Sequence, residues 1–258
     1  MKKPFGQHFL FDKNILRKII SCSNITENDT VVEIGPGLGP LTALLSEHAK
    51  KVFAIEFDKK LLERLKANLA EKTNVEIINA DALKFPYDII RGKFKVVANI
   101  PYNITTPLIF TLLEYKEKIP SMTLLMQKEV AKRIVASPGS REYGILSIVL
   151  HLYTVPELKF SVSRKVFSPP PDVDSAVVHF KVSPFLRYQV SDEALLLYVV
   201  KTAFSQRRKT ILNSLKKLTA IADALSRSGI DPGLRPEKIS VEKFVRLANT
   251  LRLLYINT

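Results

Sequence analysis

Apolar residues along the first 185 positions form two kinds of segment. Short β-branched runs are typical of buried strands, and longer segments with an apolar residue every three or four positions are typical of amphipathic helices. Regular alternation of the two predicts an α/β fold, a parallel sheet with helices on both faces. The strands are expected from residue 30 and over 51–56, 75–78, 94–98, 121–126, 156–162 and 176–182. One helix is expected to follow the N-cap Asp12, and another is expected to begin near Thr105. Further helices are expected to include 41–45 and to span 58–70, 128–136 and 143–152.

Beyond residue 185 the pattern is helical only. Ser183-Pro184-Phe185 ends the last expected strand, and later glycines and prolines separate the helical segments. We therefore expect a larger α/β domain over 1–185 and a smaller all-helical domain over 186–258. The expected helices of the smaller domain are 191–204, 206–217, 219–228 and 240–254.

The charge of the chain is positive and unevenly distributed. Its 258 residues carry a formal net charge of +14, and the 73 residues from Leu186 onward hold 13 Lys and Arg against 6 Asp and Glu. This excess of positive charge favours a polyanionic partner, most commonly nucleic acid. The alternative is a soluble protein that is simply rich in lysine. Five basic residues on the expected helix 206–217 have no acids between them, which favours phosphate binding over a solvated face. They are Arg207, Arg208, Lys209, Lys216 and Lys217.

The sequence disfavours several classes of protein. Cys22 is the only cysteine, which excludes an internal disulfide and is typical of the reducing cytoplasm. No run approaches the roughly 20 apolar residues of a membrane span, and we expect no signal peptide and no membrane partner. His8, His48, His151 and His179 lack metal-ligand spacing, so we expect no metal site.

A glycine-rich turn follows the first strand of the α/β domain. Glu33 stands two residues before the alternating glycines Gly35, Gly37 and Gly39, and a helix follows the turn. Such glycines let backbone N–H groups approach a ligand closely near a helix N-terminus. Glu56 ends the next strand, 21 residues after Gly35, where a carboxylate binds ribose hydroxyls in nucleotide-binding folds. The glycine spacing differs from the dinucleotide fingerprint, which argues against an NAD enzyme.

Two more polar residues end strands of the same sheet. Asp81 and Asn99 each follow a β-branched run, and Asp81 is suited to accept a hydrogen bond from an adenine amine. A lone Asp at such a position is more often a turn residue. Ligands of parallel sheets bind at the carboxyl ends of the strands, so Gly35, Glu56, Asp81 and Asn99 are expected to meet around one ligand.

The segment Asn99-Ile100-Pro101-Tyr102 offers two kinds of contact to a planar group that carries an NH2. The Asn99 side chain and the backbone carbonyls of Ile100 and Pro101 accept its N–H protons, and the Tyr102 ring stacks on its π-system. Pro101 stiffens the backbone and holds Ile100 extended. An adenine amine is such a group, while a strand that ends in a turn beside a core tyrosine is the alternative.

These residues together resemble a known family. The Glu-x-Gly-x-Gly-x-Gly turn is similar to the first motif of S-adenosylmethionine (SAM)-dependent methyltransferases. Essentially the whole chain resembles the ribosomal RNA adenine N6-dimethyltransferase family and is most similar to its bacterial KsgA type. The resemblance implies a Rossmann-like catalytic domain, a helical RNA-binding domain and SAM as cofactor. The segments that carry it are 5–10, 33–39, 99–104, 167–175 and 203–210.

The resemblance also implies a role for each site residue. Asn99 and Pro101 would accept from the target amine, and Tyr102 would stack on the flipped base. Phe167, in a proline-held loop expected to be rigid and exposed, would form the second wall of that slot, with core packing as the alternative. Glu56 would bind the ribose of SAM and Asp81 would lie near its adenine amine. The full set for SAM is Gln7, His8, Leu10, Gly35, Gly37, Glu56, Asp81, Ala82 and Asn99.

The implied substrate is a pair of adjacent adenosines in the 3′-terminal hairpin loop of small-subunit rRNA, each methylated twice. We expect the partner to be this rRNA or an immature small subunit, and we expect the protein to be a monomer. Two positions depart from the family pattern: His8 stands where asparagine is usual, and Ile100 is frequent in the related large-subunit rRNA methylases of antibiotic resistance. Such a large-subunit methylase is the nearest alternative. A protein glutamine methyltransferase and a non-catalytic RNA-binding assembly factor are two others.

Overall fold

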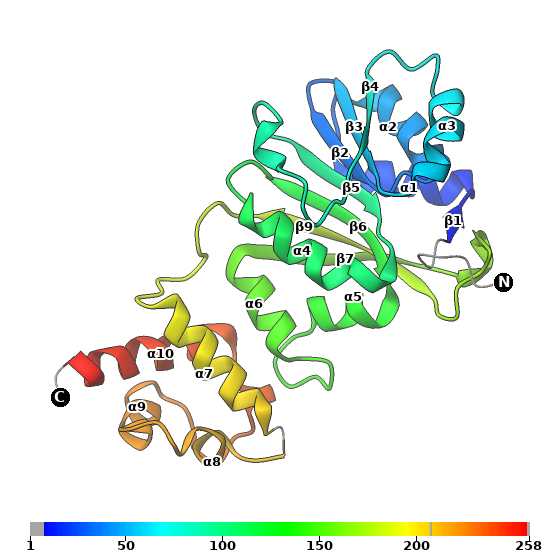
Figure 1. Ribbon diagram of the computed structural model, residues 1–258. Coiled ribbons are helices and arrows are strands. Elements are labelled where there is room, and N and C mark those ends of the chain that lie inside the picture. Colours follow the sequence, from blue (N-terminus) through cyan, green and yellow to red (C-terminus); the bar gives the residue numbers. More distant parts are fainter. Residues whose placement is uncertain (1–7, 207, 257–258) are drawn as a thin grey trace. The chain divides into compact units, whose positions relative to one another are not determined.

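The computed structural model describes residues 8–206 and 208–256 (Figure 1). The chain divides into two compact units. The first comprises the described residues of 1–131 together with 155–184, and the second comprises 132–154 together with the described residues from 185 onward. No helix in the described ranges is long and apolar enough to cross a bilayer.

The first unit is built on a seven-stranded sheet in the order β4-β3-β2-β5-β6-β9-β7. The strands from β4 to β6 pair in parallel, whereas β9 pairs antiparallel with β6. The sheet is therefore mixed, and the all-parallel expectation is wrong at this edge. The reason is local. Two strands that run parallel need a crossover connection between them, usually an α-helix. No α-helix lies between β7 and β9. The strands are β2 (Thr30–Ile34), β3 (Lys51–Glu56), β4 (Val75–Asn79), β5 (Lys95–Asn99), β6 (Ser121–Gln127), β7 (Thr154–Val162) and β9 (Ser175–Val182).

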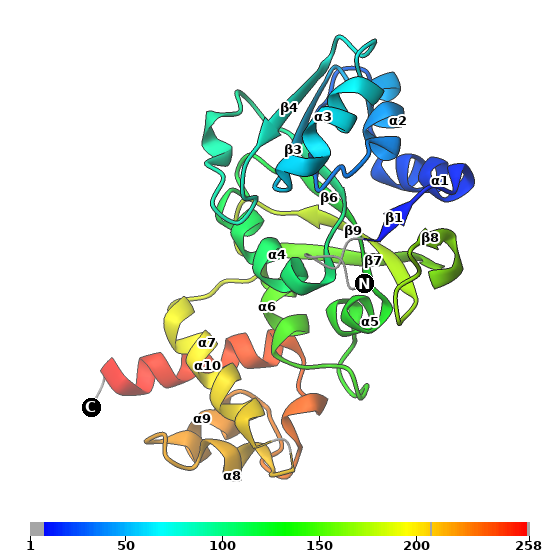
Figure 2. The same ribbon diagram turned by 45° about the vertical axis from the view of Figure 1, so that its right-hand side comes forward.

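Helices cover both faces of this sheet, as the alternating pattern predicts. The N-terminal helix α1 (Lys13–Ser23) packs on α2 (Pro40–His48) and lies over β6 and β9, while α4 (Thr105–Glu114) lies on the opposite face (Figures 1 and 2). Asp12 caps α1 as predicted, its carboxylate accepting from the N–H groups of Asn14 and Ile15 at 2.9 and 3.1 Å. The remaining helices that the first unit contains or begins are α3 (Lys59–Asn68) and α5 (Lys128–Val135).

A second, two-stranded sheet brings the N-terminal segment to the proline-rich loop. In it β1 (Phe9–Leu10) pairs antiparallel with β8 (Phe167–Ser168). Leu10 and Phe167 are neighbours in this ladder, and both are buried in one apolar cluster with Leu16. Residues that are 157 positions apart, Leu10 and Phe167, thus come together at the edge of the fold.

The second unit is helical and takes more of the chain than the sequence division assigned to it. Its helices are α6 (Ile145–Tyr153), α7 (Glu193–Ser205), α8 (Ile211–Leu215), α9 (Ile221–Arg227) and α10 (Val241–Ile256). Ile148 and Leu152 of α6 are buried in the same apolar cluster as Val199 and Phe244, so residues 132–154 pack with this unit. The later boundary falls at Pro184/Phe185, one residue before the expected one.

The expected helix over 206–217 is wrong in its extent. Among the described residues of this range, α-helix is confined to Ile211–Leu215 (α8), and Gln206 already caps the end of α7. The Thr210 side chain accepts from the N–H of Asn213 at 3.4 Å and so starts a new helix. Arg208 and Lys209 therefore lie in a turn between two helices, because the cap at Thr210 restarts the backbone hydrogen-bond pattern.

Candidate active site

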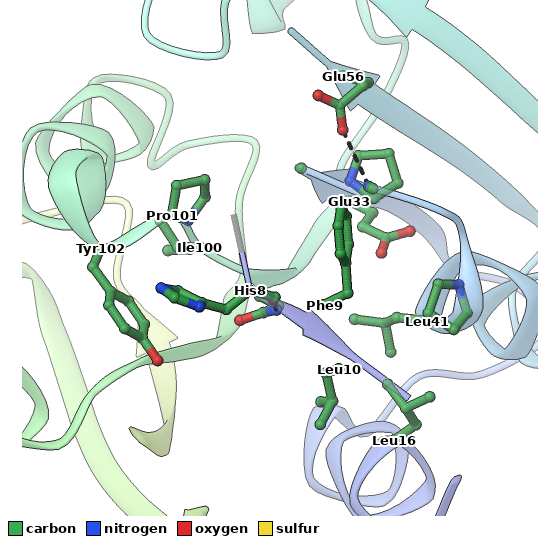
Figure 3. A pocket seen from close by; sticks show the side chains of 15 residues that line it. His8, Phe9, Leu10, Leu16, Glu33, Leu41, Glu56, Ile100, Pro101 and Tyr102 are labelled. Carbon is green, nitrogen blue, oxygen red and sulfur yellow. Dashed lines mark hydrogen bonds between the residues drawn. The ribbon is translucent and has the colours of Figure 1, made fainter. Parts of the chain in front are cut away.

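The predicted strand ends meet at two adjoining pockets on one edge of the seven-stranded sheet. Both pockets are lined by Gly35, Glu56 and Pro101. The first also holds the side chains from β1, the glycine-rich turn and the end of β5, and Figure 3 shows it from close by. Its further members are His8, Phe9, Leu10, Leu16, Glu33, Pro36, Gly37, Pro40, Leu41, Asn99, Ile100 and Tyr102. The second is further lined by Ile34, Ile55, Phe57, Asp58, Ala80, Asp81, Ala82, Leu83, Asn103 and Ile104.

Glu56 joins the glycine-rich turn to the end of β3. One carboxylate oxygen accepts from the Gly37 N–H at 3.1 Å and the other from the Asp58 N–H at 2.8 Å. Burial raises the pKa of Glu56, and these backbone hydrogen bonds oppose that shift. The carboxylate is therefore oriented by the backbone on both sides, with lone pairs still available for hydroxyl donors at the junction of the two pockets.

Gly37 gives the turn its close approach to the pocket. Its φ is +61°, and a Cβ at this position would lie 2.9 Å from the ring of Phe9. That distance is too short for two carbon atoms in contact. The turn and the ring of β1 thus pack together only because residue 37 has no side chain.

Glu33 is a buried carboxyl group in the wall of the first pocket. It is 2 % exposed, and its Oε2 has no hydrogen-bond partner in the described chain. Burial raises the pKa of Glu33 to about 8, the Thr42 hydroxyl opposes the shift, and the charge of Glu56 adds to it. A polar atom buried at this depth has lost its hydrogen bonds to water and has gained none from the protein. A polar or cationic group of a ligand would supply the missing hydrogen bond.

Asp81 lies in the second pocket, as predicted from its strand end. One of its carboxylate oxygens accepts from the Leu83 N–H at 3.0 Å, so Asp81 also shapes the turn, which was the alternative. Phe57 lines the same pocket and is 55 % exposed. Phe57 was not predicted to line the site, although an exposed aromatic directly after the strand-ending Glu56 is a usable signal.

Asn99 stands at the end of β5 with its amide held in place. Its Nδ2 donates to the backbone carbonyl of His8 at 3.3 Å, and Oδ1 has no hydrogen-bond partner within the described residues. The backbone after it is also fixed, since the Ile100 N–H donates to the carbonyl of Leu125 at 3.0 Å. Asn99 thus presents an acceptor oxygen to the first pocket.

The two backbone carbonyls after Asn99 are not equivalent. That of Pro101 accepts from the Ile104 N–H at 3.1 Å and from the Thr105 hydroxyl at 3.4 Å. Pro101 therefore closes the 3-10 turn η2 (Tyr102–Ile104) rather than offering its carbonyl to a ligand. No described group donates to the Ile100 carbonyl. The acceptor role expected of Pro101 is better suited to Ile100, because the turn that follows uses the Pro101 oxygen internally.

Tyr102 is held at its hydroxyl and faced by another ring. Its Oη lies 2.6 Å from the hydroxyl of Ser175, a buried residue at the start of β9. Burial raises the pKa of Tyr102, so the phenol is neutral at physiological pH. The ring centroids of Tyr102 and His8 are 5.7 Å apart with an angle of 30° between the planes.

Phe167 is not part of either pocket. It is 4 % exposed and packs in the apolar cluster beneath β1. This is the position that core packing predicts, and it differs from the expected wall of an aromatic slot in an exposed loop. The physical reason is the pairing with Leu10, which places Phe167 in the same buried apolar cluster as Leu10 and Leu16.

The predicted phosphate-binding residues lie in the second unit as separate groups. Arg208 and Lys209 are exposed in the turn before α8, and Lys216 and Lys217 are exposed just after it. Arg207, like the predicted cofactor residue Gln7, lies outside the described residues. Across residues 8–206 and 208–256, no three His, Cys, Asp or Glu side chains gather as a metal site would require.

Comparison with known proteins gives a consistent set of relatives. A family model described as ribosomal RNA adenine dimethylase matches residues 1–253. The chain is 43 % identical to the ribosomal RNA small subunit methyltransferase A of Moorella thermoacetica, over 97 % of this chain and 92 % of the relative. It is also 43 % identical to the protein of the same name from Caldanaerobacter subterraneus, over 98 % of each chain.

Two solved structures share the fold over nearly the whole chain. A dimethyladenosine transferase from Plasmodium falciparum superposes with a TM-score of 0.81 at 29 % identity, covering 97 % of this chain and 98 % of that one. The 23S rRNA methyltransferase ErmE superposes with a TM-score of 0.79 at 27 % identity, covering 95 % of this chain and 99 % of that one. The fold therefore has solved counterparts over at least 95 % of the chain.

Proposed function

This chain belongs to the ribosomal RNA adenine dimethylase family, and from that premise we propose that it is a SAM-dependent rRNA methyltransferase. Its substrate is a pair of adjacent adenosines in the 3′-terminal hairpin loop of small-subunit rRNA, each methylated twice at N6. The relatives at 43 % identity, named for the small subunit, support this choice. The activity belongs to ribosome biogenesis in the cytoplasm, on an immature small subunit, with the enzyme acting as a monomer.

The observation that carries the proposal is the acceptor pair beside Tyr102. The Asn99 Oδ1 and the Ile100 carbonyl lack donors in the described chain, and both residues line the pocket that Tyr102 also lines. A primary aromatic amine has two N–H donors in the plane of its ring. Two acceptors and one stacking surface match such a group.

The residues of the two pockets fit SAM. Because Gly37 has no side chain, the Phe9 ring packs against the glycine-rich turn, and the turn and β1 together line the first pocket. Glu56 is suited to the ribose hydroxyls and Asp81 to the adenine amine, and the unpartnered oxygen of Glu33, a residue that lines the first pocket, is suited to a polar or cationic group of the cofactor. When bound, SAM would supply a methyl group whose bond to the positively charged sulfur breaks as the bond to the amine nitrogen forms, so that a neutral thioether leaves and the methylated amine releases a proton to solvent. We place these described residues in the cofactor site: His8, Leu10, Gly35, Gly37, Glu56, Asp81, Ala82 and Asn99.

The protein's task is then to present the amine in line with the methyl group, and positioning contributes more than acid–base chemistry. The lone pair of an adenine amine is delocalised into the ring. Hydrogen bonds from its two N–H groups to Asn99 and Ile100 favour a more tetrahedral nitrogen, whose lone pair then points out of the ring plane. Removing the base from its stack costs a few kcal/mol, which stacking on Tyr102 offsets. A hairpin loop lowers this cost because its bases are partly unstacked.

Phosphate binding is assigned to the second unit. Its exposed basic side chains neutralise backbone phosphates without reading sequence, and they add affinity that falls with salt. Arg208, Lys209, Lys216 and Lys217 are the described members of this set, and Arg207 is its fifth member in the sequence.

The test is transfer of labelled methyl groups from SAM to unmethylated small-subunit particles and, in parallel, to protein-free large-subunit rRNA. The product nucleosides are then identified. We expect N6,N6-dimethyladenosine on the small subunit only. Label on large-subunit rRNA alone would instead support the resistance-type methylase, which Ile100 and the likeness to ErmE favour. SAM binding without transfer to either RNA would indicate a non-catalytic assembly factor.

A further inference from the structure

Two buried carboxyl groups share the first pocket. Glu33 of β2 is 2 % exposed and Glu56 of β3 is 4 % exposed, and both line the pocket (Figure 3). Glu33 pairs with Ala54 in the parallel ladder between the two strands, and Glu56 follows Ala54 by two residues. Side chains two positions apart on a strand project from the same face of a sheet. The two carboxyl groups therefore lie on one face of neighbouring strands.

The hydrogen bonds of these two groups differ. The Glu56 carboxylate accepts from the N–H groups of Gly37 and Asp58, and such bonds favour its charged form. The Glu33 Oε2, by contrast, has no donor within the described residues. Since two like charges in one buried site oppose each other, the group without donors is the one that keeps its proton. Glu33 is that group while the pocket holds no cation.

The surroundings of Glu33 supply no positive charge. Among the described residues that line the two pockets there is no Lys or Arg, and the titratable side chains are Glu33, Glu56, Asp58, Asp81 and His8. On β5 the apolar Val97 stands opposite Glu33. Burial raises the pKa of Glu33 to about 8, the Thr42 hydroxyl of α2 opposes this shift, and the charge of Glu56 adds to it. No cationic side chain contributes to the pKa shift.

We propose that Glu33 holds a proton in the cofactor-free protein and releases it when a cationic group of SAM enters the first pocket, so that cofactor binding expels a proton to solvent. This rests on the proposed function and adds a proton to its cofactor-binding step. SAM carries two cations, the sulfonium and the α-ammonium, and an opposite charge beside a buried carboxyl group favours the ionised form. Only the O–H bond of Glu33 breaks. The proton passes to water or buffer, and the carboxylate remains as the partner of the cation.

The consequence is a link between pH and cofactor affinity. The free protein holds a proton that the complex lacks, so SAM affinity rises with pH as long as free Glu33 is still protonated. We expect a rise of about fivefold from pH 6 to pH 7.5. At pH 7 we expect about half to one proton to be released for each SAM bound.

The experiment is calorimetric titration with SAM in two buffers of different ionisation enthalpy, which counts the protons released, and it is repeated over the pH series. In Glu33→Gln both the release and the rise of affinity with pH should disappear. Any protonation change of the amino group of SAM itself occurs with both proteins, so the difference between them belongs to Glu33. The matched control is Glu237→Gln in the 3-10 turn η4 (Pro236–Lys238) of the second unit. The Glu237 Oε2 also lacks a partner within the described residues, but Glu237 lines neither pocket, so this variant should release protons as the wild type does.

Titration with S-adenosylhomocysteine distinguishes the two cations, because this product keeps the α-ammonium but has a neutral sulfur. Proton release with both compounds would identify the ammonium as the partner of Glu33. Release with SAM alone would identify the sulfonium. Either result supports the proposal.

Equal proton counts for the wild type and Glu33→Gln would overturn the proposal, as would an equal loss of release in Glu237→Gln. If Glu33→Gln does not fold, infrared difference spectra of the wild type provide the test. The carbonyl band of a protonated carboxyl group should be lost when SAM binds, and its persistence would contradict the proposal. No RNA is present in these titrations, so a failure to methylate rRNA leaves their result intact. Absence of SAM binding would remove both this proposal and the SAM-dependent function.

Discussion

At the residue scale, Asn99 is the side chain on which turnover should depend most. Its Oδ1 has no other partner in the described chain, and the amide is oriented by the His8 carbonyl. We expect Asn99→Ala to lower kcat by about 100-fold or more, the scale seen when one polar contact to the reacting group is removed. SAM binding, measured by calorimetry, should be weakened far less. Equal losses in turnover and in SAM affinity would show that Asn99 is only a binding or structural residue.

Glu33 should make the stability of the cofactor-free protein depend on pH. Its pKa is raised from an ordinary value of 4.5 to about 8, so the folded state keeps a proton that the unfolded state loses in this range. Stability therefore falls as pH rises between these two values. Glu33→Gln removes this pH dependence. The free energy of unfolding of the variant minus that of the wild type should therefore rise by roughly a few kcal/mol from pH 5 to pH 8.

The measurement is chemical denaturation of the wild type and of Glu33→Gln at both pH values without SAM. The comparison between two pH values serves as its own control, because any change in packing caused by the amide contributes equally at each. A difference between the two proteins that is the same at pH 5 and pH 8 would show that Glu33 is ionised in the folded state throughout.

At the element scale, the glycine-rich turn and β1 form one packed unit around the cofactor pocket. Gly37→Ala places a Cβ 2.9 Å from the Phe9 ring and also strains a backbone with φ of +61°. We expect SAM affinity to fall by about tenfold or more. Relief of the clash moves the turn away from β1, and hydrogen bonds between the turn and the cofactor weaken when their distances grow. Calorimetric titration with SAM measures the change.

Gly92→Ala is the matched control for this variant. Gly92 has a similar φ of +74°, but nothing lies within 4 Å of a Cβ built there. Both substitutions carry the backbone strain of an alanine at positive φ, which costs about 1 kcal/mol of stability or more. SAM affinity should change only in Gly37→Ala. Equal effects in the two variants would assign the loss to backbone strain rather than to the clash with Phe9.

Element boundaries were predictable where a local signal marks them. The strand over 51–56 agrees with β3, since its β-branched residues are buried between β2 and β4. The N-cap at Asp12 likewise gave the start of α1. The helix expected over 206–217 was wrong, because the Thr210 cap restarts the chain in the middle of a run whose residue types all tolerate a helix.

At the scale of the whole molecule, the uneven charge should determine how RNA binding responds to salt. Changing Arg208, Lys209, Lys216 and Lys217 to glutamine removes four exposed charges from the second unit. We expect weaker rRNA binding and a shallower dependence of log affinity on log salt, by about 0.7 to 0.9 for each phosphate that is no longer neutralised. Filter binding over a salt series measures both, and SAM affinity should be unchanged.

A charge-matched control is available on α3. Changing Lys59, Lys60, Arg64 and Lys66 to glutamine removes the same net charge from the first unit. If this set lowered the salt slope as much, overall charge rather than the basic surface of the second unit would account for RNA affinity.

The sequence by itself determined the strands of the seven-stranded sheet in their order along the chain, and the convergence of Gly35, Glu56, Asp81 and Asn99 on one edge of that sheet. These follow from local periodicity and from the rule that parallel strands share their carboxyl ends, so no tertiary information is needed. The likeness to a methyltransferase family also followed from short motifs, each contained in one segment.

Only the tertiary structure decided which atoms of those residues are available. The turn after Pro101 uses the Pro101 carbonyl as an acceptor and leaves the Ile100 carbonyl without a donor. Pairing of β1 with β8 encloses Phe167 in the core. The same pairing brings the His8 ring onto the Tyr102 ring. Each of these depends on packing between distant segments, which one-dimensional patterns do not encode. Side-chain identity is written in the sequence, but burial and hydrogen-bond partners are set by the packed fold.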